Sequence, residues 1–174
     1  MRFLISRISR ISVVLFSLMA VSVHAASPVR AQGELAYFEP GQYRIIVMAN
    51  ARLVHVDGGN DRLASTRYQV LDGYSLFNIA QFGDGMAEIS VAATGRRWHV
   101  DGGGDKLLST RYQPHDAFTR FRIIRMNDRL GGFRIQVEAT GRYLHEDGLG
   151  DRLLSTRYQV NDAFSRFAII PYRQ

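Results

Sequence analysis

The sequence predicts an all-β fold made of three copies of one unit, and three observations support this. Segments starting at residues 51, 95 and 141 align with one another without a gap. Within each segment, apolar and polar residues alternate with a period of two, which is the pattern of strands rather than helices. The chain also has 16 Gly and only 4 Pro, a composition that suits the many turns of a short-stranded β protein.

The spacing inside the three copies is constant. Each copy has one histidine near the end of its second predicted strand, at His55, His99 and His145. The serine of an STRYQ motif follows ten positions later, and an aspartate follows seventeen positions later, at Asp72, Asp116 and Asp162. Only the junctions vary, since the first two copies start 44 residues apart and the last two 46. The two additional residues fall in the turn at residues 126–132.

Each copy is expected to contain four short strands. In the second copy the first strand alternates through Ile89, Val91 and Ala93, and the second, GRRWHV, ends at an Asp-Gly turn. The third, KLLSTRYQ, pairs back across that turn, because Asp-Gly is a strong hairpin signal. The fourth alternates Phe121 with Ile123. The apolar faces of the first and fourth strands predict the core residues Ile45, Val47, Ile89, Val91, Ile135, Val137, Phe77, Phe121 and Phe167.

Twelve strands in three units are similar to the β-trefoil, a resemblance that implies a threefold barrel capped by hairpins. A β-propeller also uses four strands in a unit of this size, but it needs at least four blades to close, so three units favour the trefoil. We expect a single β-trefoil domain at residues 35–174. Its repeats would lie at about 41–86, 87–132 and 133–174.

The N-terminal region is typical of a secretory signal peptide. Three arginines in the first ten residues precede an apolar run of 13 at residues 11–23, which is too short to span a bilayer. We expect cleavage after Ala25 or Ala26, with Ala31 as an alternative. The signal peptide would then occupy residues 1–26 and a short linker residues 27–34. The mature protein would be exported, to the periplasm or the external medium, without a membrane span.

Charge and cysteine content exclude several classes of protein. The formal net charge is +6, but after removal of residues 1–26 it falls to +3, with basic and acidic residues interleaved. This argues against nucleic acid as a partner, because phosphate binding needs a clustered basic surface. The absence of cysteine excludes disulfides, a cysteine nucleophile and thiolate metal sites. We therefore expect a monomer whose stability rests on its core.

Two strings carry a resemblance to known trefoils. GRYLHEDG and GRRWHVDG, with the aromatic-rich fourth strand, resemble the fascin-like (actin-crosslinking-like) β-trefoil units, although the first copy departs from the pattern with Ala51, Arg52, Leu53 and Val54. Ricin-type trefoil lectins share the fold, but their Gln-x-Trp signature does not occur and the one tryptophan is Trp98. Arabinofuranose-binding trefoil modules similarly place a His and an Asp in each unit. The fascin-like resemblance implies binding to a protein surface such as an actin filament, and the other two imply glycan binding.

Polar residues that recur in all three copies are the candidates for a binding site, because burial explains repeated apolar residues but not repeated polar ones. A His and an Asp two positions apart on a strand project from the same face. Val54, Trp98 and Leu144 should face the core, so we expect each histidine to face outward or toward the rim. Carboxylate, imidazole and amide groups suit sugar hydroxyls, and an aromatic plane suits a pyranose face. The candidate ligand-binding residues are His55, Asp57, Asp61, Arg67, Tyr68, His99, Asp101, Asp105, Arg111, Tyr112, His145, Asp147, Asp151, Arg157 and Tyr158, with Gln69 and its counterparts in addition.

Other interpretations of these polar residues remain open. They can be scaffold, with Asp starting the turn, Arg pairing with Asp and Tyr covering the rim of the barrel. The loops DGGND, DGGGD and DGLGD offer few oxygen ligands for calcium, and a zinc site would need three separate histidines to converge on one ion. Ser, His and Asp recur three times without a G-x-S-x-G motif, which argues against a hydrolase. We expect a secreted, non-catalytic binding module without cofactor or metal that recognises a glycan or polysaccharide, with a fascin-like protein-binding module as the alternative.

Overall fold

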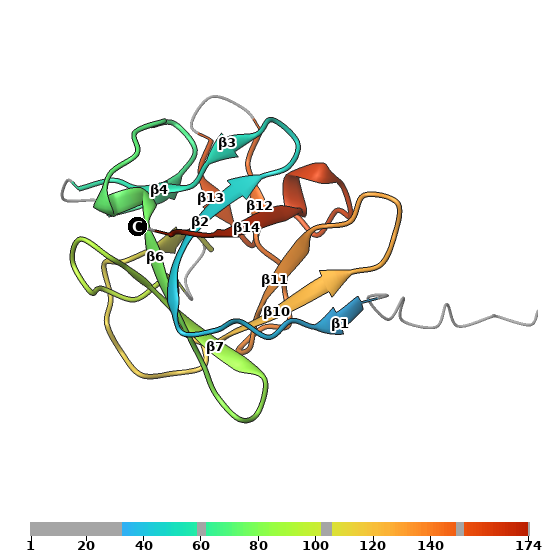
Figure 1. Ribbon diagram of the computed structural model, residues 1–174, viewed down its shortest axis with the longest axis horizontal. Helices are drawn as coiled ribbons and strands as arrows, with labels where there is room; N and C mark the ends of the chain where they lie inside the picture. Colours follow the sequence, from blue (N-terminus) through green and yellow to red (C-terminus); the bar gives the residue numbers. More distant parts are fainter. Residues whose placement is uncertain (1–32, 59–61, 102–105, 149–151, 174) are drawn as a thin grey trace, which may run out of the picture.

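The computed structural model describes residues 33–58, 62–101, 106–148 and 152–173. Six strands form a closed antiparallel barrel, in which each strand pairs with two others in the order β7-β10-β11-β14-β2-β6 and back to β7 (Figure 1). Closure leaves the barrel without a free edge, which protects an all-β protein from edge-to-edge association. The barrel strands are β2 (Gly41–Val47), β6 (Phe77–Gln81), β7 (Met86–Val91), β10 (Phe121–Met126), β11 (Phe133–Val137) and β14 (Phe167–Pro171).

Two short strands lie against the outside of the ring. β1 (Gly33–Leu35) pairs with the far end of β10, and β3 (Arg52–Leu53) pairs with β2. Gly33 and Glu34, which the sequence placed in a linker, are therefore part of the sheet. Two single turns of 3-10 helix, η1 (Gly73–Ser75) and η2 (Ala163–Ser165), precede β6 and β14. Among the described residues, no helix is both long and apolar enough to cross a membrane.

Three two-stranded hairpins form a second layer over the barrel, one from each repeat. Neighbouring hairpins are joined in a cycle, because a backbone amide of each donates a hydrogen bond to a carbonyl oxygen of another. Thr110 N donates to Arg62 O, Thr156 N to Lys106 O and Thr66 N to Arg152 O, all at 2.9 Å. This cycle gives the molecule its pseudo-threefold arrangement. The hairpins are β4 (His55–Val56) with β5 (Ala64–Ser65), β8 (His99–Val100) with β9 (Leu108–Ser109), and β12 (His145–Glu146) with β13 (Leu154–Ser155).

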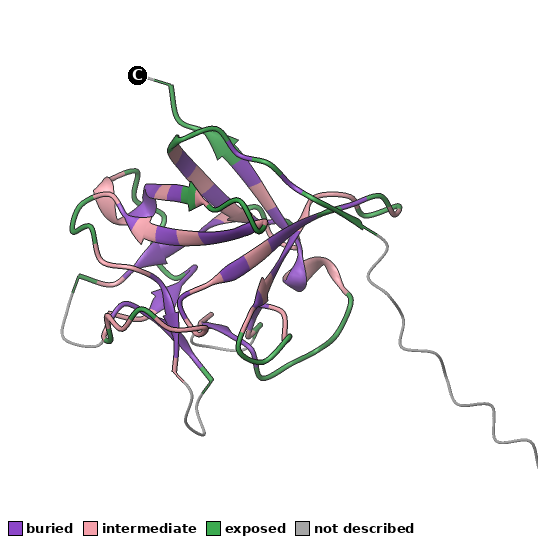
Figure 2. Cartoon of the chain, turned by 90° about the horizontal axis from the view of Figure 1, so that it is seen from below, coloured by how far each residue is buried: buried purple, intermediate pink, exposed green. Residues whose placement is uncertain are grey.

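The predicted core is confirmed, since all nine predicted residues are fully buried. Buried and partly buried positions alternate along the barrel strands, as the period-two pattern requires (Figure 2). Trp98 lies among the phenylalanines, edge-on to Phe77 with ring centroids 5.0 Å apart and to Phe121 at 6.2 Å. Complete burial of one such side chain contributes about 1.5 to 3 kcal/mol, so this cluster is a main source of stability in a chain without disulfides.

The second and third strands of each repeat are shorter than the sequence predicted, and a glutamine side chain explains this. In the first repeat Gln69 Oε1 accepts a hydrogen bond from Leu53 N at 2.9 Å, and Gln69 Nε2 donates to Leu53 O at 3.2 Å. The glutamine thus occupies the backbone groups that a longer strand would use. Gln113 and Gln159 make the same pair of bonds to Arg97 and Tyr143. The recurrent glutamine is therefore scaffold, not ligand-binding surface.

Candidate functional site

The three repeated histidines are buried, so they do not face outward into solvent, although His145 lines a pocket at the rim, the other position that the sequence suggested. His55, His99 and His145 are each only 7% exposed. Each imidazole is covered by two aromatic rings from its own repeat, one at 5.5 to 5.6 Å between ring centroids and one at 5.9 to 6.0 Å. From the first to the third repeat, the closer ring belongs to Tyr68, Tyr112 and Tyr158, and the more distant ring to Tyr74, Phe118 and Phe164.

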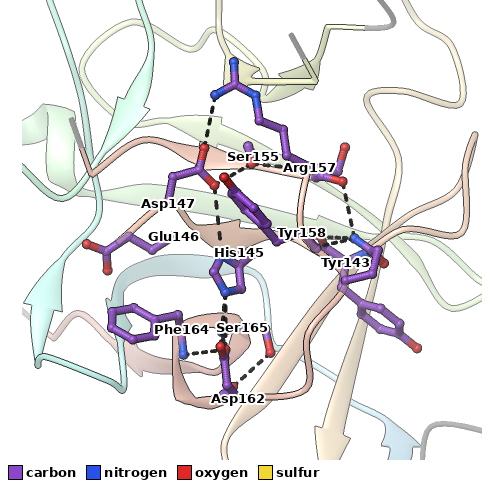
Figure 3. Close-up of polar contacts among 12 residues, drawn as sticks. Tyr143, His145, Glu146, Asp147, Ser155, Arg157, Tyr158, Asp162, Phe164 and Ser165 are labelled. Atoms are coloured by element: carbon purple, nitrogen blue, oxygen red, sulfur yellow. Dashed lines mark hydrogen bonds and ion pairs between the residues drawn. The ribbon is translucent and has the colours of Figure 1, made fainter. Parts of the chain in front are cut away.

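Two carboxylates flank each imidazole. In the third repeat, Asp147 lies 4.0 Å from His145 Nδ1 and Asp162 lies 3.3 Å from His145 Nε2, on opposite sides of the ring (Figure 3). His99 has the same arrangement, at 3.3 Å to Asp101 and 3.9 Å to Asp116. The prediction that a His and the Asp two positions later share a face is confirmed.

The aspartate that follows each histidine holds the hairpin together. Asp147 accepts a hydrogen bond from the Ser155 hydroxyl at 2.7 Å and forms an ion pair with Arg157 Nη1 at 3.3 Å (Figure 3). The Ser155 oxygen in turn accepts from Arg157 N at 3.1 Å. The same ion pair occurs in the other two repeats, between Asp57 and Arg67 at 3.1 Å and between Asp101 and Arg111 at 2.8 Å. The scaffold interpretation therefore describes these aspartates and arginines well.

The aspartate seventeen positions after each histidine is more exposed to solvent than the aspartate two positions after it. The side chains of Asp72, Asp116 and Asp162 are 39%, 42% and 37% exposed. Asp72 caps η1 by accepting from Tyr74 N at 2.9 Å and Ser75 N at 3.2 Å. Burial by itself raises the pKa of Asp72, but the two backbone amides and the His55 imidazole together outweigh it and lower the pKa below 3.8. These aspartates were absent from the predicted site set, although their constant spacing was the signal that marks them.

The tyrosine of each STRYQ motif is half exposed and keeps a free hydroxyl. Tyr68, Tyr112 and Tyr158 are 48%, 56% and 52% exposed. Among the described residues none of the three hydroxyls makes a hydrogen bond, while each ring rests on a buried imidazole. We call the tyrosine and the capping aspartate of each repeat its rim site: Tyr68 with Asp72, Tyr112 with Asp116, and Tyr158 with Asp162.

A pocket of about 380 Å³ opens at the rim site of the third repeat. Its volume is in the range of small-molecule sites, which bury most of their ligand. The wall combines apolar surface with carboxylate, guanidinium and phenol groups. The lining residues are His145, Asp147, Gly148, Leu153, Arg157, Tyr158, Val160 and Asp162.

A second hollow, of about 130 Å³, lies between the first and second repeats beside Val56, Thr94 and Thr110. At the equivalent junction of the third and first repeats, the position of Val56 is taken by Glu146, which is fully buried. Its carboxylate accepts from the Thr66 hydroxyl at 2.6 Å and from Asn50 Nδ2 at 2.9 Å. The threefold symmetry of the polar residues is therefore incomplete, and this buried carboxylate gave no periodic signal in the sequence.

Several predictions fall on residues that the structure does not describe. Asp61, Asp105, Asp151 and the signal peptide at residues 1–26 lie outside the described residues. Within the described part of the chain, no three His, Asp or Glu side chains come together as a metal site requires.

No protein-family model and no curated protein matches this chain. Solved structures do match. ThreeFoil, a designed protein with threefold symmetry, has a TM-score of 0.66 at 10% identity, over 76% of this chain and 99% of that one. A mosquitocidal holotoxin matches with a TM-score of 0.69 at 11% identity. The match covers 79% of this chain but only 18% of the toxin.

A lectin provides a third comparison. The Polyporus squamosus lectin, solved with the glycan Neu5Aca2-6Galb1-4GlcNAc, gives a TM-score of 0.61 at 17% identity, over 77% of this chain and 50% of the lectin. Sequence identities as low as these show that the proteins share a fold, and they do not show a shared function. Together with the closed barrel and the cyclic hairpins, they show that the chain is a β-trefoil, as the sequence predicted.

Proposed function

We propose that the protein is an exported, non-catalytic carbohydrate-binding module whose three rim sites each contact sugar. The observation that carries the proposal is that, in every repeat, a half-exposed tyrosine and a partly exposed carboxylate lie against the same buried histidine, and that no described residue hydrogen-bonds the tyrosine hydroxyl. The ring offers an apolar plane for a pyranose face, and the carboxylate and phenol offer partners for its hydroxyls. The pocket at Tyr158 has room for a small ligand. The glycan-bound lectin of the same fold supports this class of ligand.

The polar contacts support a non-catalytic role. In a Ser-His-Asp hydrolase the serine donates to the imidazole, which acts as its general base. Here the Ser155 hydroxyl donates to Asp147, and His145 Nε2 is directed to Asp162. Ser155 is also fully buried, which argues against a substrate reaching its oxygen. These contacts support a role for Ser155 in the hairpin rather than as a nucleophile.

Three equivalent sites suit a polymeric ligand. A single rim site offers only one aromatic ring and one capping carboxylate, and we expect it to bind weakly. A polysaccharide that engages more than one site converts the later contacts into intramolecular ones, so overall retention exceeds single-site affinity. The proposal therefore favours polysaccharides or clustered glycans over free monosaccharides.

A glycan array run beside an actin co-sedimentation assay tests the proposal. Tyr158→Ala removes one third of the sites, and we expect it to lower glycan binding by more than one third because avidity is lost with the site. Binding should be abolished when Tyr68, Tyr112 and Tyr158 are all replaced by alanine. Tyr37→Ala is the matched control, because Tyr37 is 73% exposed and lies outside the rim sites. No glycan binding on the array, together with co-sedimentation of the protein with actin filaments, would support the fascin-like alternative. Loss of glycan binding in Tyr37→Ala would show that the effect of the tyrosine substitutions is not specific to the rim sites.

A further inference from the structure

Two buried arginines lie next to each other in the third repeat. β11 pairs with β14 at Phe133 and Phe167, so the next residues of this antiparallel register are Arg134 and Arg166. Arg134 is 6% exposed and Arg166 is fully buried. Burial lowers the pKa of Arg134, and the charge on Arg166 acts in the same direction. Both guanidinium groups nevertheless stay charged, because arginine is not deprotonated in proteins.

The two arginines have too few acceptors. Arg166 Nη2 donates to Asp128 and to Asn161, but its Nε and Nη1 have no partner among the described residues. The Arg134 guanidinium stacks on Tyr143, 3.5 Å from the ring centroid, and its Nε also has no partner. Three buried donor nitrogens on cations are therefore unsatisfied, an arrangement that is costly unless a further acceptor is bound.

The second repeat has a carboxylate at one of the two equivalent positions. The residue equivalent to Arg134 is Glu88, which accepts from Arg97 Nε at 3.0 Å and lies 3.4 Å from His115 Nδ1. The residue equivalent to Arg166 is Arg120, which pairs with Glu138 at 3.2 Å and also with Asp84. In the second repeat a carboxylate thus stands where the third repeat has a second guanidinium.

We propose that Arg134 and Arg166 together bind a small monovalent inorganic anion, with chloride as the physiological representative. The three guanidinium nitrogens that have no acceptor among the described residues are the donors that such an anion would satisfy. Asp128 and Asp162 both act electrostatically on Arg134, but the Asp162 carboxylate accepts from the backbone amides of η2 and lies against His145, so it does not satisfy these donors. The ligand is small because both arginine side chains are buried. This site is independent of the sugar-binding proposal.

Thermal unfolding at constant ionic strength tests the anion site. An anion that binds the folded state raises Tm as its concentration rises, whereas ionic strength alone acts equally for all salts. We expect Tm of the mature protein to rise by about 2 to 4 °C when sodium gluconate is replaced by sodium chloride. Equal Tm in the two salts would overturn the proposal.

Two variants locate the effect. Arg134→Glu places a carboxylate where the second repeat has Glu88, and we expect it to abolish the chloride dependence. Arg125→Glu makes the same change of charge at an exposed position of β10 and should keep that dependence. Chloride dependence that survives in Arg134→Glu would contradict the assignment. If that variant does not fold, a crystal of the native protein soaked in bromide provides the test. An anomalous peak between Arg134 and Arg166 would support the anion site, and the absence of such a peak would contradict it.

Discussion

The guanidinium of Arg111 donates a hydrogen bond of 2.8 Å to the carboxylate of Asp101, joining the residue after β8 to a residue just beyond β9. The same carboxylate accepts from the Ser109 hydroxyl at 3.0 Å and lies 3.3 Å from His99 Nδ1. Its side chain is only 13% exposed. Asp101 is thus the point where both strands of the hairpin and the buried imidazole meet.

Replacing Asp101 by Asn should destabilise the protein without touching a rim site. We expect the free energy of unfolding to fall by about 1 to 3 kcal/mol, because a charged acceptor of several buried or half-buried donors is lost. Tyr112→Phe is the control, since the Tyr112 hydroxyl has no partner in the described part of the chain and its removal should leave stability unchanged. Urea denaturation measures both. Equal stability of Asp101→Asn and the native protein would show that the hairpin does not depend on this carboxylate.

Truncation of a core phenylalanine should be far more costly than truncation of an exposed one. Phe121 is fully buried and lies against Trp98, so Phe121→Ala should lower the free energy of unfolding by about 3 to 5 kcal/mol. Phe82, at 43% exposed, provides the comparison, and Phe82→Ala should cost less than about 1 kcal/mol. Chemical denaturation measures the free energy of unfolding of both variants. Similar losses of stability would contradict the assignment of Phe121 to the core face of its strand and of Phe82 to the surface.

Ala51 is a position where stability can be increased. It has φ of +55°, in the left-handed region that Gly95 and Gly141 occupy in the other repeats at +67° and +64°. Glycine adopts this conformation without the steric penalty of a Cβ, so Ala51→Gly should raise stability by up to about 1 kcal/mol.

The reverse change provides the matched experiment. A Cβ on Gly95 would meet no atom within 4 Å, so Gly95→Ala tests backbone conformation alone and should lower stability by a similar amount. Differential scanning calorimetry of both variants should show Tm moving in opposite directions. A lower Tm for Ala51→Gly would mean that backbone strain is not what distinguishes the first repeat.

Acid should remove part of the stability through Asp72. The pKa of Asp72 is lowered in the folded protein by the amides of Tyr74 and Ser75 and by His55, which outweigh the opposite effect of burial. A depressed carboxyl pKa contributes stability above its unfolded value, and this contribution is lost as pH falls below 3.8 through the folded value. Asp72→Asn should therefore be less stable than the native protein at pH 6, with the two converging near pH 2. Stability curves that stay parallel over this range would contradict the assignment.

The sequence alone determined the three repeats, the barrel strands and the core. Residues such as Phe121 and Ile89 follow a local period of two, and the hydrophobic effect alone requires that the apolar face of such a strand be buried. The pairing of an aspartate with an arginine in each hairpin was also predictable, because the Asp-Gly turn brings the two strand ends together. These features depend on residues close to one another in the chain.

The character of the site was decided only by the tertiary structure. His145 is buried because Tyr158 and Phe164, thirteen and nineteen positions away, fold back over its two faces, and no strand periodicity contains that information. The juxtaposition of Arg134 and Arg166 likewise arises only when β14 pairs with β11 to continue the barrel. Side-chain burial and charge compensation depend on which distant elements pack together, whereas periodicity reports only which face of each element seeks the core.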